Sequence, residues 1–147
     1  MATPVPKKND IVSVTITDIG NSGEGIGKAD GYTLFVKGAV VGDVVAAKVL
    51  KAKKTYGYAK VEEVLTPSAC RVTPTCPVAG RCGGCQLQFM DYEAQISFKE
   101  RKVKECLERI GGITFGASGE EISAGRPEFL PILGMEHPVH YRNKAQY

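Results

Sequence analysis

Short runs in which apolar and polar residues alternate, separated by glycine-containing turns, fill most of the first 66 residues of this chain. In the first run Val12, Val14 and Ile16 alternate with serine and threonine, the period-two pattern of a strand with one buried face. A glycine-rich turn with a short edge segment follows at residues 20–27, and further β-prone runs occupy residues 32–36, 44–50 and 57–65. Short strands at this spacing predict a small closed or nearly closed β-barrel.

One later segment, residues 91–110, has the periodicity of a helix. Its apolar residues recur at spacings of three, four and seven and so share one face. Asp91 is placed to cap the N-terminus of this helix, and Gly111 and Gly112 are placed to end it. The apolar residues of the face are Tyr92, Ile96, Val103, Leu107 and Ile110.

The end of the chain carries a second set of strand-like runs. Residues 113–130 are rich in glycine, serine and glutamate and predict a loop. Residues 130–135 and 139–147 read as the opening strands of a further α+β domain. The expected fold class is therefore mainly β with one α-helix: a small OB-like barrel, a cysteine-rich loop, the helix, and the start of that further domain.

The composition is that of an ordinary globular protein. The chain has 147 residues, 43% of them hydrophobic and 24% charged, which excludes wholesale disorder. Its longest apolar run, residues 39–47, is interrupted by Gly42 and Asp43, so no segment is expected to span a membrane. The N-terminus lacks the apolar region of a signal peptide, and we therefore expect a cytoplasmic protein with no membrane partner.

Cysteine is the most unevenly distributed residue. Four of the five cysteines fall within sixteen residues, and Cys76, Cys82 and Cys85 form a C-x5-C-x2-C unit. An odd count without a secretion signal argues against a disulfide framework and favours a bound metal. Gly83 and Gly84 lie between the last two cysteines and would ease the turn that brings two thiolates to one metal.

The spacing leaves the metal and the fourth ligand open. Zinc sites usually combine two pairs of ligands, each pair closely spaced in the sequence, whereas Cys82 and Cys85 form the one such pair here. The spacing therefore favours an iron–sulfur cluster over zinc. A fourth ligand could be Cys70, Cys106 or a residue beyond Tyr147. We interpret Cys106 as a small buried hydrophobe on the helix, and Cys70 as a structural thiol more readily than a ligand.

The motifs around the cysteines resemble a known family. The runs Pro74-Thr75-Cys76-Pro77, Arg81-Cys82-Gly83-Gly84-Cys85-Gln86-Leu87-Gln88 and Tyr92-Glu93-Ala94-Gln95 are similar to those of the bacterial 23S rRNA (uracil-5-)-methyltransferases. In that family a TRAM RNA-binding domain precedes a [4Fe-4S] segment and a catalytic domain that uses S-adenosylmethionine. Residues 23–27, 35–39 and 42–43 resemble TRAM signatures, and residues 133–134 and 141–144 resemble the start of the family's central domain.

The resemblance implies a division of the chain and a ligand set. It implies a TRAM-like barrel over residues 1–66, an iron–sulfur segment with the helix over 67–112, and the beginning of a central or methyltransferase domain over 113–147. Cys76, Cys82 and Cys85 would hold a [4Fe-4S] cluster, with a fourth cysteine beyond Tyr147. The catalytic cysteine, the general base and the S-adenosylmethionine site belong to the later domain, so this chain alone is expected to be inactive.

A basic stretch supplies the candidate nucleic-acid site. Residues 48–60 hold five lysines and no acid, whereas the rest of the chain is slightly acidic. Lysine beside tyrosine combines phosphate attraction with surfaces on which bases stack. The alternative is a solvated edge that prevents aggregation, with the tyrosines packed in the barrel. The resemblance favours ribosomal RNA binding through Lys51, Lys53, Lys54, Tyr56, Tyr58 and Lys60.

Two other functions compete with that interpretation. One is a stand-alone TRAM-type RNA-binding module with a structural zinc site and no catalysis. The other is a radical enzyme with a TRAM domain, which the x5 spacing disfavours because such enzymes use C-x3-C-x2-C. The sequence indicates no obligate protein partner.

Overall fold

The computed structural model describes residues 5–116 and 126–139. The chain divides into two compact units, Met1–Asp91 and Tyr92–Tyr147. The first unit holds all five strands and the cysteine-rich segment, and the second holds the helix.

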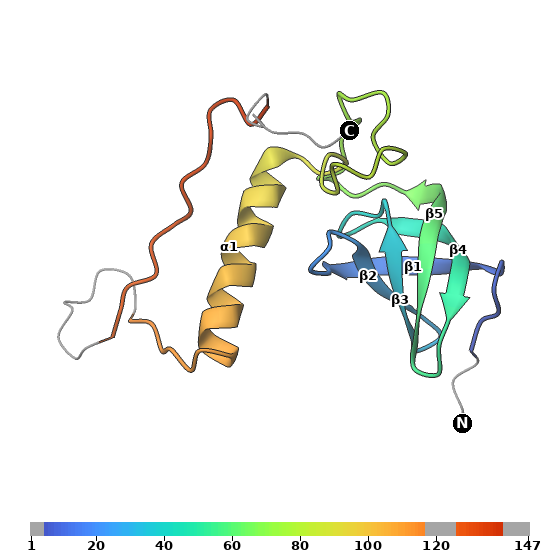
Figure 1. Cartoon of the computed structure of the whole chain (residues 1–147), viewed down its shortest axis with the longest axis horizontal. Helices are drawn as coiled ribbons and strands as arrows, with labels where there is room; N and C mark the ends of the chain where they lie inside the picture. The colour runs from blue at the N-terminus through green and yellow to red at the C-terminus, as the bar shows by residue number, and fades with distance from the viewer. Residues whose placement is uncertain (1–4, 117–125, 140–147) are drawn as a thin grey trace. The chain divides into compact units, whose positions relative to one another are not determined.

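The first unit is built on a closed five-stranded barrel with the strand order β1-β2-β3-β5-β4 (Figure 1). Its strands are β1 (Ile11–Ile19), β2 (Gly25–Ala29), β3 (Tyr32–Lys37), β4 (Val44–Ala52) and β5 (Tyr56–Thr66). Neighbouring strands are antiparallel except β3 and β5, which pair in parallel. The expected OB-like barrel is confirmed, and each β-prone run forms a strand.

The barrel is closed because alternate residues of every strand can be buried together. Val14 and Ile16 of β1 are 1% exposed, and Leu34, Val45 and Val49 from β3 and β4 are fully buried. Burying one such side chain stabilises the fold by about 1.5–3 kcal/mol. The residues that alternate with these point outward, so the outer face of the barrel is available for interactions outside the core.

A glycine allows the close pairing of β1 and β2. Gly27 lies opposite Ile16 in the register of these strands. A Cβ at this position would lie 2.3 Å from the carbonyl oxygen of Thr15 and 2.5 Å from Val14 Cγ1. A larger residue would therefore push the two strands apart, which explains the glycine at this position of β2.

The second unit contains α1 (Tyr92–Arg109), close to the expected helix at residues 91–110. None of its residues is buried, so its apolar face is at most partly covered. Gly112, at φ 66°, ends the helix, and the N–H of Ile113 turns back to the carbonyl of Leu107. Cys106 is exposed on this helix. Its interpretation as a buried hydrophobe was wrong, because the described residues supply no apolar layer over that side of α1.

The strand expected at residues 130–135 is absent from the structure. Those residues are irregular. A strand would need backbone hydrogen bonds to a partner strand, whereas two of their backbone N–H groups donate to side chains of α1. The N–H of Ile132 donates to Glu100 Oε2 at 2.8 Å, and that of Met135 donates to the hydroxyl of Tyr92 at 2.9 Å. The strand expected at residues 139–147 falls outside the described residues, except for Val139, which is in no strand.

The described part of residues 113–130 is irregular, as expected for a loop. The rings of Phe115 and Phe129 pack edge to face with 5.1 Å between centroids, which joins its two ends. Over the described parts of the chain, no helix combines the length and the hydrophobicity needed to cross a bilayer.

Candidate nucleic-acid interface

Strand β5 presents the predicted tyrosines and one predicted lysine on the outside of the barrel. Gly57 and Ala59 point inward and are buried, so the residues that alternate with them, Tyr56, Tyr58 and Lys60, point outward. Tyr58 retains 40% of its surface exposed, and Lys60 is exposed as well. The alternative that these tyrosines are barrel packing is therefore wrong, because the core is complete without them.

A third ring joins the two tyrosines. Phe35 of β3 lies opposite Tyr58 in the parallel register of β3 and β5. Its ring centroid is 5.7 Å from those of both Tyr56 and Tyr58, and the two tyrosine rings are 5.8 Å apart. Contacts at these separations are typical of aromatic clusters. Sequence reasoning missed Phe35, since its outward position follows from alternation in β3 but its neighbours follow only from the β3–β5 pairing.

Lys53 lies over this aromatic cluster. Its Nζ is 4.8 Å from the ring centroid of Tyr56 and 5.8 Å from that of Tyr58, within the range of cation–π attraction. It also donates a hydrogen bond to the hydroxyl of Tyr56 at 2.8 Å. That bond raises the pKa of Lys53 and lowers the pKa of Tyr56. Lys53 is therefore positively charged at neutral pH and held beside two rings.

The turn that carries Lys53 is fixed from inside the barrel. Tyr32 is 3% exposed, and its hydroxyl donates to the carbonyl of Lys53 at 2.8 Å and contacts the carbonyl of Tyr56. The same hydroxyl accepts from the N–H of Lys53 at 3.1 Å. A buried tyrosine thus orders the backbone of an exposed turn, which reduces the entropy lost when a ligand binds there.

The other predicted lysines are arranged around the same cluster. Lys51 lies opposite Tyr58 in the β4–β5 register, and Lys54 is exposed in the turn between these strands. Lys60 forms an ion pair with Glu62 at 3.7 Å. The structure therefore brings Lys51, Lys53 and the two tyrosines together, while Lys54 is placed only by its position in the turn.

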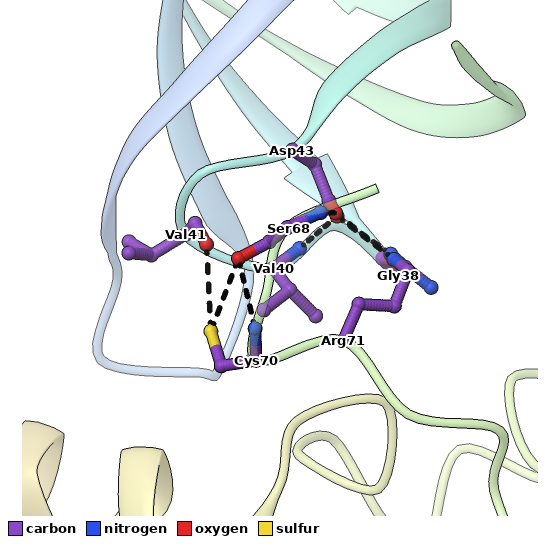
Figure 2. Close-up of polar contacts among 7 residues, drawn as sticks. All are labelled: Gly38, Val40, Val41, Asp43, Ser68, Cys70 and Arg71. Atoms are coloured by element: carbon purple, nitrogen blue, oxygen red, sulfur yellow. Dashed lines mark hydrogen bonds and ion pairs between the residues drawn. The ribbon is translucent and has the colours of Figure 1, made fainter. Parts of the chain in front are cut away.

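A buried ion pair ties the cysteine-rich segment to the barrel. Asp43 is fully buried, and both of its carboxylate oxygens accept from Arg71, at 2.7 Å from Nη2 and 3.0 Å from Nε (Figure 2). Arg71 also donates to the carbonyl of Gly38 at 2.7 Å. The backbone N–H groups of Val40 and Ser68 complete the bonding of the carboxylate. The carboxylate is thus fully hydrogen-bonded, as a buried charge requires.

Burial alone would raise the pKa of Asp43. The hydrogen bonds from Arg71, and then those from the N–H groups of Ser68 and Val40, outweigh this effect and hold the pKa below its usual value of 3.8. Asp43 is therefore ionised in the folded protein at neutral pH.

A glycine next to Asp43 makes the contact with Ser68 possible. Gly42 adopts φ 89°, and a Cβ there would lie 2.8 Å from the hydroxyl oxygen of Ser68. Cys70 follows, with its Sγ 3.1 Å from that hydroxyl and 3.7 Å from the carbonyl oxygen of Val41 (Figure 2). The Cys70 thiol thus contacts the β3–β4 loop, which agrees with its interpretation as a structural thiol.

The C-x5-C-x2-C unit forms a series of turns. The N–H of Cys82 donates to the carbonyl of Val78, and Gly83 adopts φ 74°. Cys82 and Cys85 are exposed, and Cys76 is half-buried. Among the described residues, however, no three His, Cys, Asp or Glu side chains are grouped so that they could hold a metal ion. The donor atoms suit a metal in kind, but the three thiols are not gathered as they would be around a bound metal.

The sequence was compared with those of known proteins and families. The family model for the TRAM domain matches residues 7–61, which cover most of the barrel. An uncharacterized RNA methyltransferase of Clostridium tetani is 44% identical over 140 residues, which are 95% of this chain and 28% of that protein. Residues 7–61 thus match the TRAM domain, and nearly the whole chain is similar to RNA methyltransferases.

Other relatives agree in name and in coverage. An uncharacterized RNA methyltransferase of Halalkalibacterium halodurans is 45% identical over 95% of this chain and 28% of its own length. One from Listeria monocytogenes is 42% identical over 99% of this chain and 30% of its own length. This TRAM-containing chain thus spans less than a third of the curated relatives it matches.

Among solved structures, the chain is similar to the Pyrococcus abyssi tRNA (uracil-54, C5)-methyltransferase in complex with S-adenosyl-L-homocysteine. The sequences are 26% identical, the TM-score is 0.44, and the match covers 65% of this chain and 21% of the other.

Proposed function

We propose that this chain is the RNA-binding portion of an S-adenosylmethionine-dependent RNA uracil-5-methyltransferase, with 23S ribosomal RNA as its substrate in the cytoplasm. One observation carries the proposal: lysines and aromatic rings gather on the outer face of a TRAM barrel, where the core does not need them. The names of the relatives support methyl transfer to RNA. The choice of uracil C5 rests on the motif resemblance of residues 74–88 and 92–95.

The role of the described residues in this proposal is to hold the RNA. Lys51, Lys53 and Lys54 would neutralise phosphates and release counterions, which makes affinity fall steeply with salt. Tyr56 and Tyr58 would contact bases, and Lys60 would add charge. Methyl transfer would depend on residues outside this chain, so the chain by itself is expected to bind RNA without methylating it.

The experiment is an RNA titration of the full chain by fluorescence anisotropy at 50 to 200 mM salt. If five or six phosphates are contacted, the affinity for a single-stranded RNA falls roughly 130- to 340-fold across this range. A variant with Lys51, Lys53 and Lys54 changed to Gln should reduce the slope of log K against log salt by about two.

A matched variant removes the same charge from another basic surface. Lys99, Lys102 and Lys104 of α1, changed to Gln, should leave the affinity and its salt slope nearly unchanged. A flat salt response of the unmodified chain, or a larger loss in the α1 variant than in the barrel variant, would count against the proposal.

The proposal for the cysteine-rich segment is separate. We propose that Cys76, Cys82 and Cys85 are ligands of a [4Fe-4S] cluster, and the support for this is their spacing and the motif resemblance. Anaerobic purification tests it by iron, sulfide and zinc content together with absorption near 400 nm. Iron and sulfide that disappear on Cys82→Ser support the cluster. Zinc without iron favours the RNA-binding module with a structural zinc site, and protein free of metal would show that the three thiols of this chain do not hold a metal by themselves.

A further inference from the structure

The outward residues of β3, β5 and β4 line up in rows that run across the strands. Phe35, Tyr58 and Lys51 are successive partners in the β3–β5 and β5–β4 registers. Two residues further along β3 and β5, Lys37 pairs with Lys60, and Lys60 pairs with Lys48 of β4. The barrel therefore carries one row with two rings and a lysine beside a second row made of lysines.

The lysine row is unfavourable in the unbound protein. Like charges that lie directly opposite each other on neighbouring strands repel and destabilise a sheet. Strands lie about 4.8 Å apart, so the three Cα atoms span roughly 10 Å. Lys37 and Lys60 are exposed, Lys48 is half-buried, and Glu62 offsets only part of the charge by pairing with Lys60 at 3.7 Å. An anion placed along this row would relieve the repulsion.

The aromatic row offers a different kind of contact. The rings of Phe35 and Tyr58 are tilted by 32° with 5.7 Å between centroids, and Tyr58 is 40% exposed. The two rows are two residues apart along β3 and β5, about 6.6 Å, and three residues apart along β4, where the register shifts between Val49 and Lys51. This separation lets one nucleotide place its phosphate on the lysines while its base reaches the rings.

We propose that the outer face of β3–β5–β4 binds unpaired RNA, with the sugar–phosphate backbone along Lys37, Lys60 and Lys48 and a base against Tyr58 and Phe35. This inference rests on the proposed RNA-binding function and narrows the substrate class to single-stranded segments. In a duplex the bases already stack on one another, so the rings could not reach them, whereas an unpaired base offers its face to an aromatic side chain. Lys53, held over Tyr56 and Tyr58, adds positive charge beside the base.

The experiment compares a single-stranded RNA of twelve nucleotides with the duplex of the same sequence, using the full chain at one salt concentration. The single strand is expected to bind at least tenfold more tightly. Tyr58→Ala should weaken single-strand binding about 5- to 100-fold, the range expected for one lost base stack, and should leave duplex binding nearly unchanged. Phe35→Leu, which retains apolar bulk, should have a smaller effect in the same direction.

Two further variants test the lysine row separately from the aromatic row and control for the loss of an exposed apolar side chain elsewhere on β5. Lys37→Gln together with Lys48→Gln should lower the salt slope by about 1.4, since each lost phosphate contact removes about 0.7. Leu65→Ala removes another exposed apolar side chain of β5 and should not change binding.

Tyrosine fluorescence gives an independent measurement of the base contact. The chain contains no Trp, so tyrosine emission can be measured directly. Single-stranded RNA should quench this emission less in Tyr58→Leu than in the unmodified chain.

The outcomes distinguish this inference from the function on which it rests. If the chain binds neither the single strand nor the duplex, both the proposed RNA-binding function and this inference are wrong. If single strand and duplex bind equally and Tyr58→Ala has no effect, while the lysine variants still lose affinity, RNA binding stands and this inference is overturned. A Tyr58→Ala variant with an altered melting curve is replaced by Tyr58→Leu, to which the same criteria apply.

Discussion

The barrel and the segment that follows it are stabilised in different ways. The barrel buries alternate apolar residues of five strands around one core, so many small contributions add up. Of residues 67–91, all of them described, Met90 alone is buried. That segment is joined to the barrel mainly by polar contacts, above all the pair of Asp43 and Arg71. A stretch poor in apolar side chains thus acquires a defined position by satisfying one buried carboxylate.

The largest expected effect is the loss of that carboxylate. Asp43→Ala leaves the Arg71 guanidinium and two backbone N–H groups without their acceptor, and removal of one partner of a buried pair costs about 3–5 kcal/mol. Urea unfolding measures the change in free energy, and amide exchange locates it. The exchange of Ser68 and of the neighbouring segment should accelerate more than that of the barrel strands.

Two matched variants sharpen this comparison. Leu34→Ala creates a cavity in the barrel core and should cost about 2–5 kcal/mol, but it should accelerate exchange in the strands first. Glu63→Gln changes an exposed acid of β5 and should stay within about 0.5 kcal/mol. The comparison between the two regions fails if Asp43→Ala is as stable as the unmodified chain or affects both regions equally.

The next effect is the dependence of stability on pH. Because the pKa of Asp43 in the folded protein lies below its usual value of 3.8, the unfolded chain takes up a proton first as the pH falls. The stabilisation is therefore fully present above about pH 5 and is lost as the pH falls through the folded-state pKa. Thermal melts between pH 3 and pH 7 should show this decline. The decline in stability should be smaller in Asp43→Asn. An identical decline in both proteins would show that protonation of Asp43 does not cause it.

The smallest effect is expected at the exposed thiols. In the metal-free chain, Cys82→Ser and Cys85→Ser should change the free energy of unfolding by less than about 0.5 kcal/mol, because both residues are exposed. Urea unfolding in the presence of chelator and reductant measures this. A loss of several kcal/mol would show that the thiols, together with the Asp43–Arg71 ion pair, hold residues 67–91 in place.

The barrel and the second unit, Tyr92–Tyr147, also differ in how far the sequence predicted their structure. Alternation in residues 12–16 and 57–65 placed the strands correctly, because burial on one face of a strand leaves a period-two pattern in the sequence itself. In the structure the same alternation leaves Tyr56, Tyr58 and Lys60 on one face of β5. Reasoning from the sequence failed at residues 130–135, where an apolar run suggested a strand but the backbone bonds to side chains of α1. It failed at Cys106 because helical periodicity does not say whether a face is covered.

The sequence by itself therefore determined the β-barrel, the single helix and the basic, tyrosine-containing stretch, all of which depend on residues near one another in the chain. Tertiary structure decided that Phe35 and Lys37 join that stretch, since the parallel pairing of β3 with β5 brings them there. It also decided that Asp43 and Arg71, 28 positions apart, form a buried pair. Local patterns record which face of an element is buried, whereas contacts between distant residues depend on strand order and register, which no short window of sequence contains.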